Sequence, residues 1–259
     1  MTLPLFYQGS ENTFPTDSQT FSITGQPAHH AHNVVRLGAG DQIRYADGEG
    51  SWVDATITEV TGQGRDVSLQ LQVDDRGTEA TPTPVLHMIQ ALAKQDRDLQ
   101  AVETATEYGV DQISPLQSER CIVRWKGNRA AKSHQKWENL VAKAGQQARR
   151  SRIPVLGPLL EGTDVTELCR EPDTLVIVLD ETGHADLRAA LQELGGLDSL
   201  ANYRQIAIVI GPEGGFSDAE RNAWFQAGAV GVRLGEIIMR ASSAGPALLA
   251  VLNHLLKRW

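Results

Sequence analysis

The chain has 259 residues, a length that suits one large domain or two small ones, and its 41% of hydrophobic residues can bury a core. No apolar run approaches the roughly 18 residues of a membrane span, and the first ten residues lack the pattern of a signal peptide. The two cysteines, Cys121 and Cys169, have no metal-ligand spacing. We therefore expect a reduced, cytoplasmic protein with no membrane partner and no metal site.

The formal net charge is −8, but it is unevenly distributed along the chain. Residues 1–80 carry 4 basic and 11 acidic side chains, whereas residues 119–152 carry 10 basic and 2 acidic ones. A concentrated basic stretch in an acidic protein is typical of a surface that binds a polyanion. The alternative is a solvated helix face whose charges have partners within the protein, and charge alone does not decide between the two.

Short apolar runs separated by turn signals dominate the first 80 residues. They predict a short helix over residues 28–37 and strands over residues 21–23, 41–45, 52–57 and 67–73. This spacing indicates a small β-barrel or sandwich. Residues 75–84 are rich in Pro, Thr and Gly and are typical of a linker, so we place the first domain at residues 1–76.

Beyond the linker, predicted strands alternate with predicted helices. The strands are expected over residues 85–91, 110–116, 121–125, 175–179, 206–210 and 230–234. The helices are expected over residues 99–108, 132–150, 184–194, 217–227 and 242–257. Alternation of this kind implies a mostly parallel sheet, so we expect an α/β fold for the second domain, residues 82–259.

The most informative stretch is residues 206–216, IAIVIGPEGGF. An apolar β-branched run is typical of a buried parallel strand, and here it delivers a glycine-rich loop at its carboxyl end. Ligands bind beyond the carboxyl ends of strands in open α/β sheets, and glycines let backbone amides approach them closely. Ser217, with Glu220 three residues later, predicts a capping box at the start of the next helix.

A second strand–loop–helix unit follows at residues 230–245. Leu179, Ile210 and Leu234 each close a predicted strand, and three such ends would line one crevice with apolar walls and exposed backbone groups. That crevice suits a neutral, adenine-bearing ligand better than a pyrophosphate. The chain has neither a G-x-G-x-x-G motif after a first strand nor a G-x-x-x-x-G-K-[ST] motif, which disfavours dinucleotide and nucleoside triphosphate binding.

Several blocks of the sequence resemble a known family. IVIGPEGGFSDAE followed by VRLGEIIMRASSA resembles the knotted SPOUT methyltransferases. The blocks HAHNVVRLGAG at residues 30–40, TATEYGV at 104–110 and ISPLQSER at 113–120 occur in the order typical of the RsmE family. The resemblance covers nearly the whole chain. The chain departs from the family pattern at residues 5–7 and, in the second loop, at Glu236, Ser242 and Ser243.

The resemblance implies both a fold and an activity. Members have a PUA-like β-barrel domain followed by an α/β domain with a deep trefoil knot, and they are homodimers. They use S-adenosyl-L-methionine to methylate N3 of a specific uridine in 16S ribosomal RNA of the small ribosomal subunit. Two alternatives stay open, namely a SPOUT methyltransferase acting on a different RNA and a non-catalytic RNA-binding protein that kept the knot.

Matching the family blocks residue by residue implies three groups of site residues. The cofactor would be bound by Leu179, Ile210, Gly211, Gly214, Gly215, Leu234, Gly235, Ile238, Met239, Arg240 and Ala244. Arg240 could either stabilise charge on the uracil oxygens or grip a phosphate, and Glu213 could either remove a proton or brace the loop. RNA contacts are expected from Arg36, Arg120, Arg124, Arg149, Arg150 and Arg152.

Overall fold

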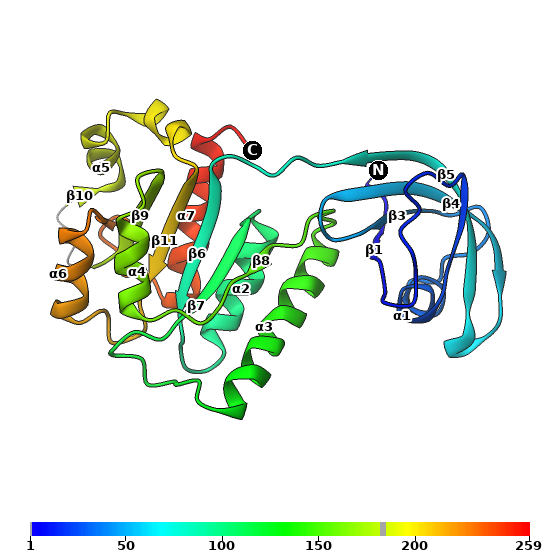
Figure 1. The fold of residues 1–259 in the computed structure, drawn as a ribbon, viewed down its shortest axis with the longest axis horizontal. Coiled ribbons are helices and arrows are strands. Elements are labelled where there is room, and N and C mark those ends of the chain that lie inside the picture. The colour runs from blue at the N-terminus through cyan, green and yellow to red at the C-terminus, as the bar shows by residue number, and fades with distance from the viewer. Residues whose placement is uncertain (1, 182–184) are drawn as a thin grey trace. The chain divides into compact units, whose positions relative to one another are not determined.

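The computed structural model describes residues 2–181 and 185–259, which form two compact units (Figure 1). The first unit comprises Met1–Thr81 together with Gly145–Ile153, and the second comprises Pro82–Ala144 with Pro154–Trp259. The sequence-based boundaries differ in two respects: they end the first domain at residue 76, and they place residues 145–153 in the second domain. Those residues are held in the first unit by long-range hydrogen bonds, such as that from the Ile153 amide to the Gly48 carbonyl (2.9 Å).

The first unit is built on a five-stranded sheet with the order β1-β3-β4-β5-β2. Its strands are β1 (Leu5–Tyr7), β2 (Thr20–Ile23), β3 (Gln42–Ala46), β4 (Ser51–Thr61) and β5 (Ser68–Thr78). All pairs are antiparallel except β1 with β3. Since β1 and β2 end the strand order, backbone pairing does not close the predicted barrel in the described part of the chain. Alternate side chains of these strands fill one core, as the period of two along a strand requires.

The helical part of the first unit begins and ends three residues earlier than the sequence indicated. In place of one helix over residues 28–37 there are α1 (Gly25–His29) and a π-helical turn, His30–Val34. A single-turn 3-10 helix, Gly64–Asp66, precedes β5. Ala28 and Ala31 of the helical segment are buried in the core of the sheet.

The second unit contains a seven-stranded sheet whose pairs are all parallel. Its order is β10-β12-β9-β11-β6-β7-β8. The strands are β6 (Val85–Ala91), β7 (Gln112–Leu116), β8 (Val155–Leu156), β9 (Thr174–Leu179), β10 (Ala185–Asp186), β11 (Gln205–Ile210) and β12 (Val230–Arg233). The predicted α/β class with a mostly parallel sheet is thus confirmed. The trefoil knot stays a prediction from the family resemblance.

The helices of the second unit pack around this sheet (Figure 1). They are α2 (Arg97–Glu107), α3 (Asn128–Gln147), α4 (Gly162–Cys169), α5 (Leu187–Glu193), α6 (Asp218–Gln226) and α7 (Ala241–Leu255), with a 3-10 helix at Leu197–Asn202. The last three residues of α3 belong to the first unit. Helices α2 and α7 contact each other and β6, while α4 contacts β9 and α6. Within the described residues, no helix is both long and apolar enough to cross a membrane.

One predicted strand is wrong, and three short strands and one α-helix were not predicted. Residues 121–125 form a loop, because both edges of β7 are already paired, with β6 and with β8. The ring of Trp125 packs edge-on against Trp137 of α3, with centroids 5.5 Å apart, so this loop is held by packing. The unpredicted elements are β1, β8, β10 and α4, all of them eight residues or shorter.

A buried histidine lies in the middle of the parallel sheet. His87 on β6 is 3% exposed, and its ring nitrogens lie 2.9 Å from Ser114 Oγ and 2.9 Å from Gln205 Nε2. Burial lowers the pKa of His87 to about 3, because the charged imidazolium would lose its hydration there.

Because of His87, we expect the second unit to become less stable against unfolding in acid. Between about pH 6.5 and 3, unfolded His87 binds a proton that the folded form does not, so its stabilising contribution is complete above pH 6.5 and is lost as the pH falls. The slope approaches about 1.4 kcal/mol per pH unit. We expect the free energy of unfolding, measured with urea, to fall between pH 7 and pH 5 by about 2 kcal/mol more in the wild type than in His87→Gln. Equal losses would contradict this assignment.

Candidate active site at the carboxyl edge of the sheet

Strands β12, β9 and β11 are neighbours, and their carboxyl ends meet at one edge of the sheet. Leu179 pairs with Ile210 on one side and with Val232 on the other, so the three strand ends are level. A cavity of about 740 Å³ opens at this edge, and we call it the carboxyl-edge cavity. The prediction that these three strands are neighbours is confirmed.

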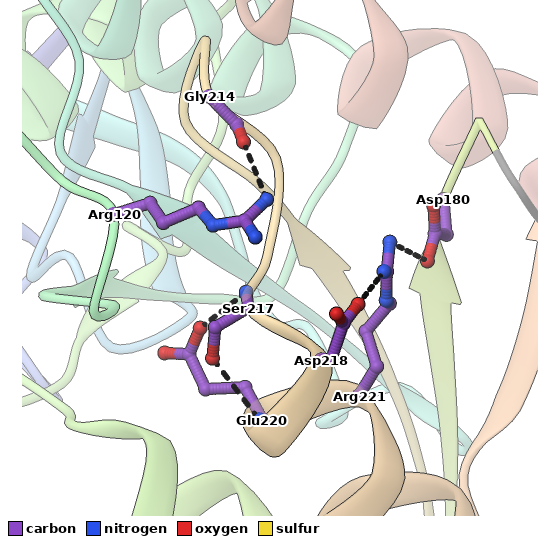
Figure 2. A network of polar contacts seen from close by, with 7 residues as sticks. All are labelled: Arg120, Asp180, Gly214, Ser217, Asp218, Glu220 and Arg221. Atoms are coloured by element: carbon purple, nitrogen blue, oxygen red, sulfur yellow. Dashed lines mark hydrogen bonds and ion pairs between the residues drawn. The ribbon is translucent and has the colours of Figure 1, made fainter.

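The glycine loop, residues 211–215 after β11, forms one wall of the cavity. Its turn is closed by a hydrogen bond from the Gly215 amide to the Pro212 carbonyl (2.9 Å), with Gly215 in the left-handed region at φ +64. The predicted capping box follows (Figure 2): Ser217 Oγ accepts from the Glu220 amide at 3.2 Å, and Glu220 Oε2 accepts from the Ser217 amide at 3.0 Å. The loop therefore runs into a fixed helix start.

Polar side chains from three elements border the glycine loop (Figure 2). Arg120, which follows β7, donates from Nη1 to the Gly214 carbonyl at 3.3 Å. Arg221 of α6 bonds Asp218 and lies 3.4 Å from Oδ2 of Asp180, the residue after β9. Arg120, Asp180 and Arg221 all line the cavity, which the sequence reasoning did not foresee. For Asp180, the available signal was its place directly after an apolar strand.

The loop between β12 and α7 forms the opposite wall. It turns at Gly235, where φ is +77, and then exposes the apolar side chains of Ile237 (82%) and Ile238 (77%). Arg240 is the N-cap of α7, and its carbonyl accepts from the amides of residues 243 and 244. Its exposed guanidinium has no hydrogen bond or ion pair within residues 2–181 and 185–259.

Glu213 in the glycine loop is tied to a neighbouring segment. Its Oε1 accepts a hydrogen bond from the Lys94 amide at 3.1 Å and lies 3.6 Å from Nη1 of Arg97. Both contacts join the glycine loop to the start of α2. Through these contacts the Glu213 carboxylate holds the glycine loop against this neighbouring segment.

All of the residues expected to bind the cofactor line this one cavity. They are Leu179, Ile210, Gly211, Gly214, Gly215, Leu234, Gly235, Ile238, Met239, Arg240 and Ala244. The two expected catalytic residues, Arg240 and Glu213, line it as well. Residues from three strand ends, two loops and the first turn of α7 thus converge on one space.

The residues expected to bind RNA lie in different places. In the second unit, Arg120 lines the cavity and the exposed Arg124 donates to the Glu119 carbonyl at 2.6 Å. In the first unit, Arg36 is exposed.

The other three arginines also belong to the first unit. Arg149 donates to the Thr2 carbonyl, and the backbone carbonyl of Arg150 accepts from Tyr7 Oη at 2.6 Å. Arg152 donates to the Glu79 carbonyl at 2.7 Å and packs against Gly50, where a Cβ would lie 2.3 Å from its Nη2. Its guanidinium therefore helps to hold the unit together.

Comparison with known proteins identifies the family. The RNA methyltransferase domain matches residues 80–253, and the RNA methyltransferase PUA domain matches residues 23–67. The ribosomal RNA small subunit methyltransferase E of Mycobacterium bovis is 31% identical over 262 residues, covering 100% of this chain and 94% of that protein. The protein of the same name from Bacillus subtilis is 25% identical over 239 residues, covering 92% of this chain and 91% of that protein.

A solved structure agrees with these matches. The ribosomal RNA small subunit methyltransferase E of Neisseria gonorrhoeae, bound to S-adenosyl methionine, superposes with a TM-score of 0.77 at 25% identity, covering 98% of each chain. Sequence, domain order and fold therefore agree along nearly the full length. The chain belongs to the RNA methyltransferase family that includes the ribosomal RNA small subunit methyltransferases E.

Proposed function

We propose that this protein is an S-adenosyl-L-methionine-dependent methyltransferase that methylates N3 of a specific uridine in 16S ribosomal RNA. The observation that carries the proposal is the carboxyl-edge cavity, where the glycine loop and the β12–α7 loop face one space inside the matched methyltransferase domain. The relatives' names support the small-subunit ribosomal RNA as the substrate.

The residues of the cavity fit the cofactor. Its volume of about 740 Å³ lies within the range of roughly 300–1,000 Å³ that is usual for small-molecule sites. Leu179, Ile210 and Leu234 supply apolar walls, while the glycine loop offers backbone groups with few side chains in the way. When bound, S-adenosylmethionine supplies an electrophilic methyl group on its sulfonium. The task of the protein is therefore to hold the two reactants in line, which contributes through effective molarity.

Arg240 is the residue we propose for the chemical step. Its guanidinium is exposed at the cavity and has no partner in the described part of the chain, so it is available to a substrate. Transfer of the N3 proton to solvent leaves negative charge shared by N3 and the uracil oxygens. A guanidinium that donates to one of those oxygens can stabilise this charge while N3 stays open to the methyl group. No covalent nucleophile is needed.

Glu213 has two possible roles, and its contacts favour the brace. Glu213→Gln keeps an oxygen for the Lys94 amide but cannot take a proton, so kcat should stay within a few-fold of wild type. Glu213→Ala loses the brace and should weaken cofactor binding, measured by calorimetry. A fall in kcat of a hundredfold or more in Glu213→Gln, with unchanged cofactor affinity, would instead identify Glu213 as the general base.

We also propose roles for the two units and an assembly. The first domain, residues 1–76, would bind RNA, because residues 23–67 match the RNA methyltransferase PUA domain, and residues 82–259 would carry catalysis. A homodimer is supported by the apolar side chains of Ile237 and Ile238, which line the cavity and are largely exposed, since large exposed apolar side chains favour association. A cytoplasmic location is supported by the ribosomal RNA substrate that the relatives' names give. Light scattering that shows a monomer would count against the dimer.

Two measurements test the proposed activity. The first is mass mapping of 16S ribosomal RNA from a strain that lacks the gene, with and without a plasmid copy. The 3-methyluridine should disappear and return with the plasmid, and its persistence would point to a different RNA target. The second is calorimetry with S-adenosylmethionine, in which absence of heat and of bound cofactor would favour a non-catalytic RNA-binding protein.

A further inference from the structure

One face of helix α3 carries a row of basic side chains that the cofactor site does not use. Arg129, Lys132, Lys136 and Lys143 are separated by three, four and seven residues. At 3.6 residues per turn these intervals place all four on the same narrow face, which we call the α3 basic face. It extends over about 21 Å, since each residue advances a helix by about 1.5 Å.

The α3 basic face is open to solvent and mostly unpaired. All four side chains are exposed. In the described residues, the only ion pair they make joins Lys136 Nζ to Asp96 Oδ1 at 3.2 Å, with the two side chains 62% and 76% exposed. An exposed pair of this kind contributes little stability, so it would release Lys136 readily.

The other faces of α3 are different in character. Trp137, Val141 and Ala144 are buried, and the ring of Trp137 packs edge-on against Trp125 with centroids 5.5 Å apart. Glu138, its only acidic residue, lies on the opposite side from the basic face. A solvated face built for solubility or for helix stability usually mixes both signs of charge, whereas this face has one sign only.

The basic face is continuous along the chain with the rim of the carboxyl-edge cavity. Arg120 lines that cavity, and the exposed Arg124 and Lys126 lie between it and the start of α3. Positive side chains therefore run from the cavity rim onto the helix, in a protein whose net charge is −8. The first 80 residues, with 11 acidic side chains against 4 basic ones, offer no comparable positive excess.

We propose that the α3 basic face binds the phosphate backbone of the substrate RNA and so positions the RNA against the cavity. This inference rests on the proposed function, because it assigns part of the substrate contact to the catalytic unit itself. The charged groups of lysine and arginine contact phosphates without reading the base sequence. The α3 basic face would therefore supply affinity and fix the position of the RNA, while the cavity selects the base.

The test uses the full-length protein with small ribosomal subunits that lack the methyl group. The variant Lys132→Gln/Lys143→Gln removes two positive charges from the face and leaves the Lys136 pair intact. Binding and KM for the subunits should worsen on the order of tenfold or more at 0.1 M salt, and the slope of log affinity against log salt should fall by about 1.4 to 1.8. Cofactor affinity, and kcat at saturating subunits, should not change.

Two further variants serve as matched controls. Ala131→Glu/Gln135→Glu makes the same change in net charge at exposed positions of α3 off the basic face, and it should alter binding only slightly. Lys132→Arg/Lys143→Arg keeps the charges and should restore the salt slope. An unchanged slope and KM in the glutamine variant, or an equal loss in the Ala131 control, would overturn the inference. Failure of wild type to transfer methyl while still binding RNA would instead contradict the proposed function.

Discussion

Replacing Gly214 with valine should weaken S-adenosylmethionine binding at least tenfold while the free energy of unfolding stays nearly unchanged. A Cβ at Gly214 would lie 3.7 Å from Arg120 Cβ, an ordinary contact, and this glycine is not in the left-handed region, so the fold tolerates a side chain there. Both residues line the cavity. The added methyl groups would take space that the ligand needs, and overpacking of this kind costs about 1–3 kcal/mol.

Calorimetry with the cofactor and urea unfolding measure the two quantities for the Gly214 variant. Gly38→Val is the matched control, because Gly38 also has no positive φ and a Cβ there would meet nothing within 4 Å. It lies in the first unit and should leave cofactor affinity as in wild type. If Gly214→Val keeps wild-type affinity, the glycine loop does not cradle the cofactor.

Replacing Arg240 with alanine should lower kcat by about a hundredfold or more, because removal of one donor to a developing oxyanion typically costs 10²–10³ in rate. Cofactor affinity should fall much less, since the guanidinium is proposed to meet the substrate. Arg240→Lys should recover only part of the rate, because an ammonium on a flexible stem does not reproduce the fixed, planar donor geometry of a guanidinium. Single-turnover methyl transfer at saturating cofactor and subunits measures the effect.

A surface arginine remote from the site provides the comparison for Arg240. Arg204 precedes β11, at the end of that strand opposite to the cavity, and its only ion pair in the described residues is a 4.0 Å contact to Glu171. Arg204→Ala should leave single-turnover rates unchanged. If Arg240→Ala instead raises only KM for the subunits, Arg240 grips a phosphate and does not act in the chemical step.

Elements whose signals are local in the chain were predicted well. The strand over residues 85–91 has the predicted bounds, and β9, β11 and β12 differ from the prediction by one residue at an end. The capping box at Ser217 and Glu220 was also predicted correctly. Each depends on an apolar run, a glycine or a cap within a few residues, and these act through nearby backbone.

Elements that depend on distant partners were not predictable in this way. Residues 121–125 have a strand-like composition, but the edges of β7 are taken by other strands. The short β1 and β8 exist because they pair with β3 and β7. Such pairings are decided by sequence-distant contacts, which override local propensity.

By itself, the sequence determined the alternation of strands and helices, the glycine loop at residues 211–215 and the family resemblance. Only the tertiary structure decided that Arg120 and Asp180 join that loop at one cavity, and that Glu213 is held by Lys94 and Arg97. The physical reason is that strand and cap signals lie in adjacent residues, whereas the cavity also brings together residues distant in the chain, such as Arg120 and Gly214, which are 94 residues apart. Their meeting depends on the order of strands in the sheet.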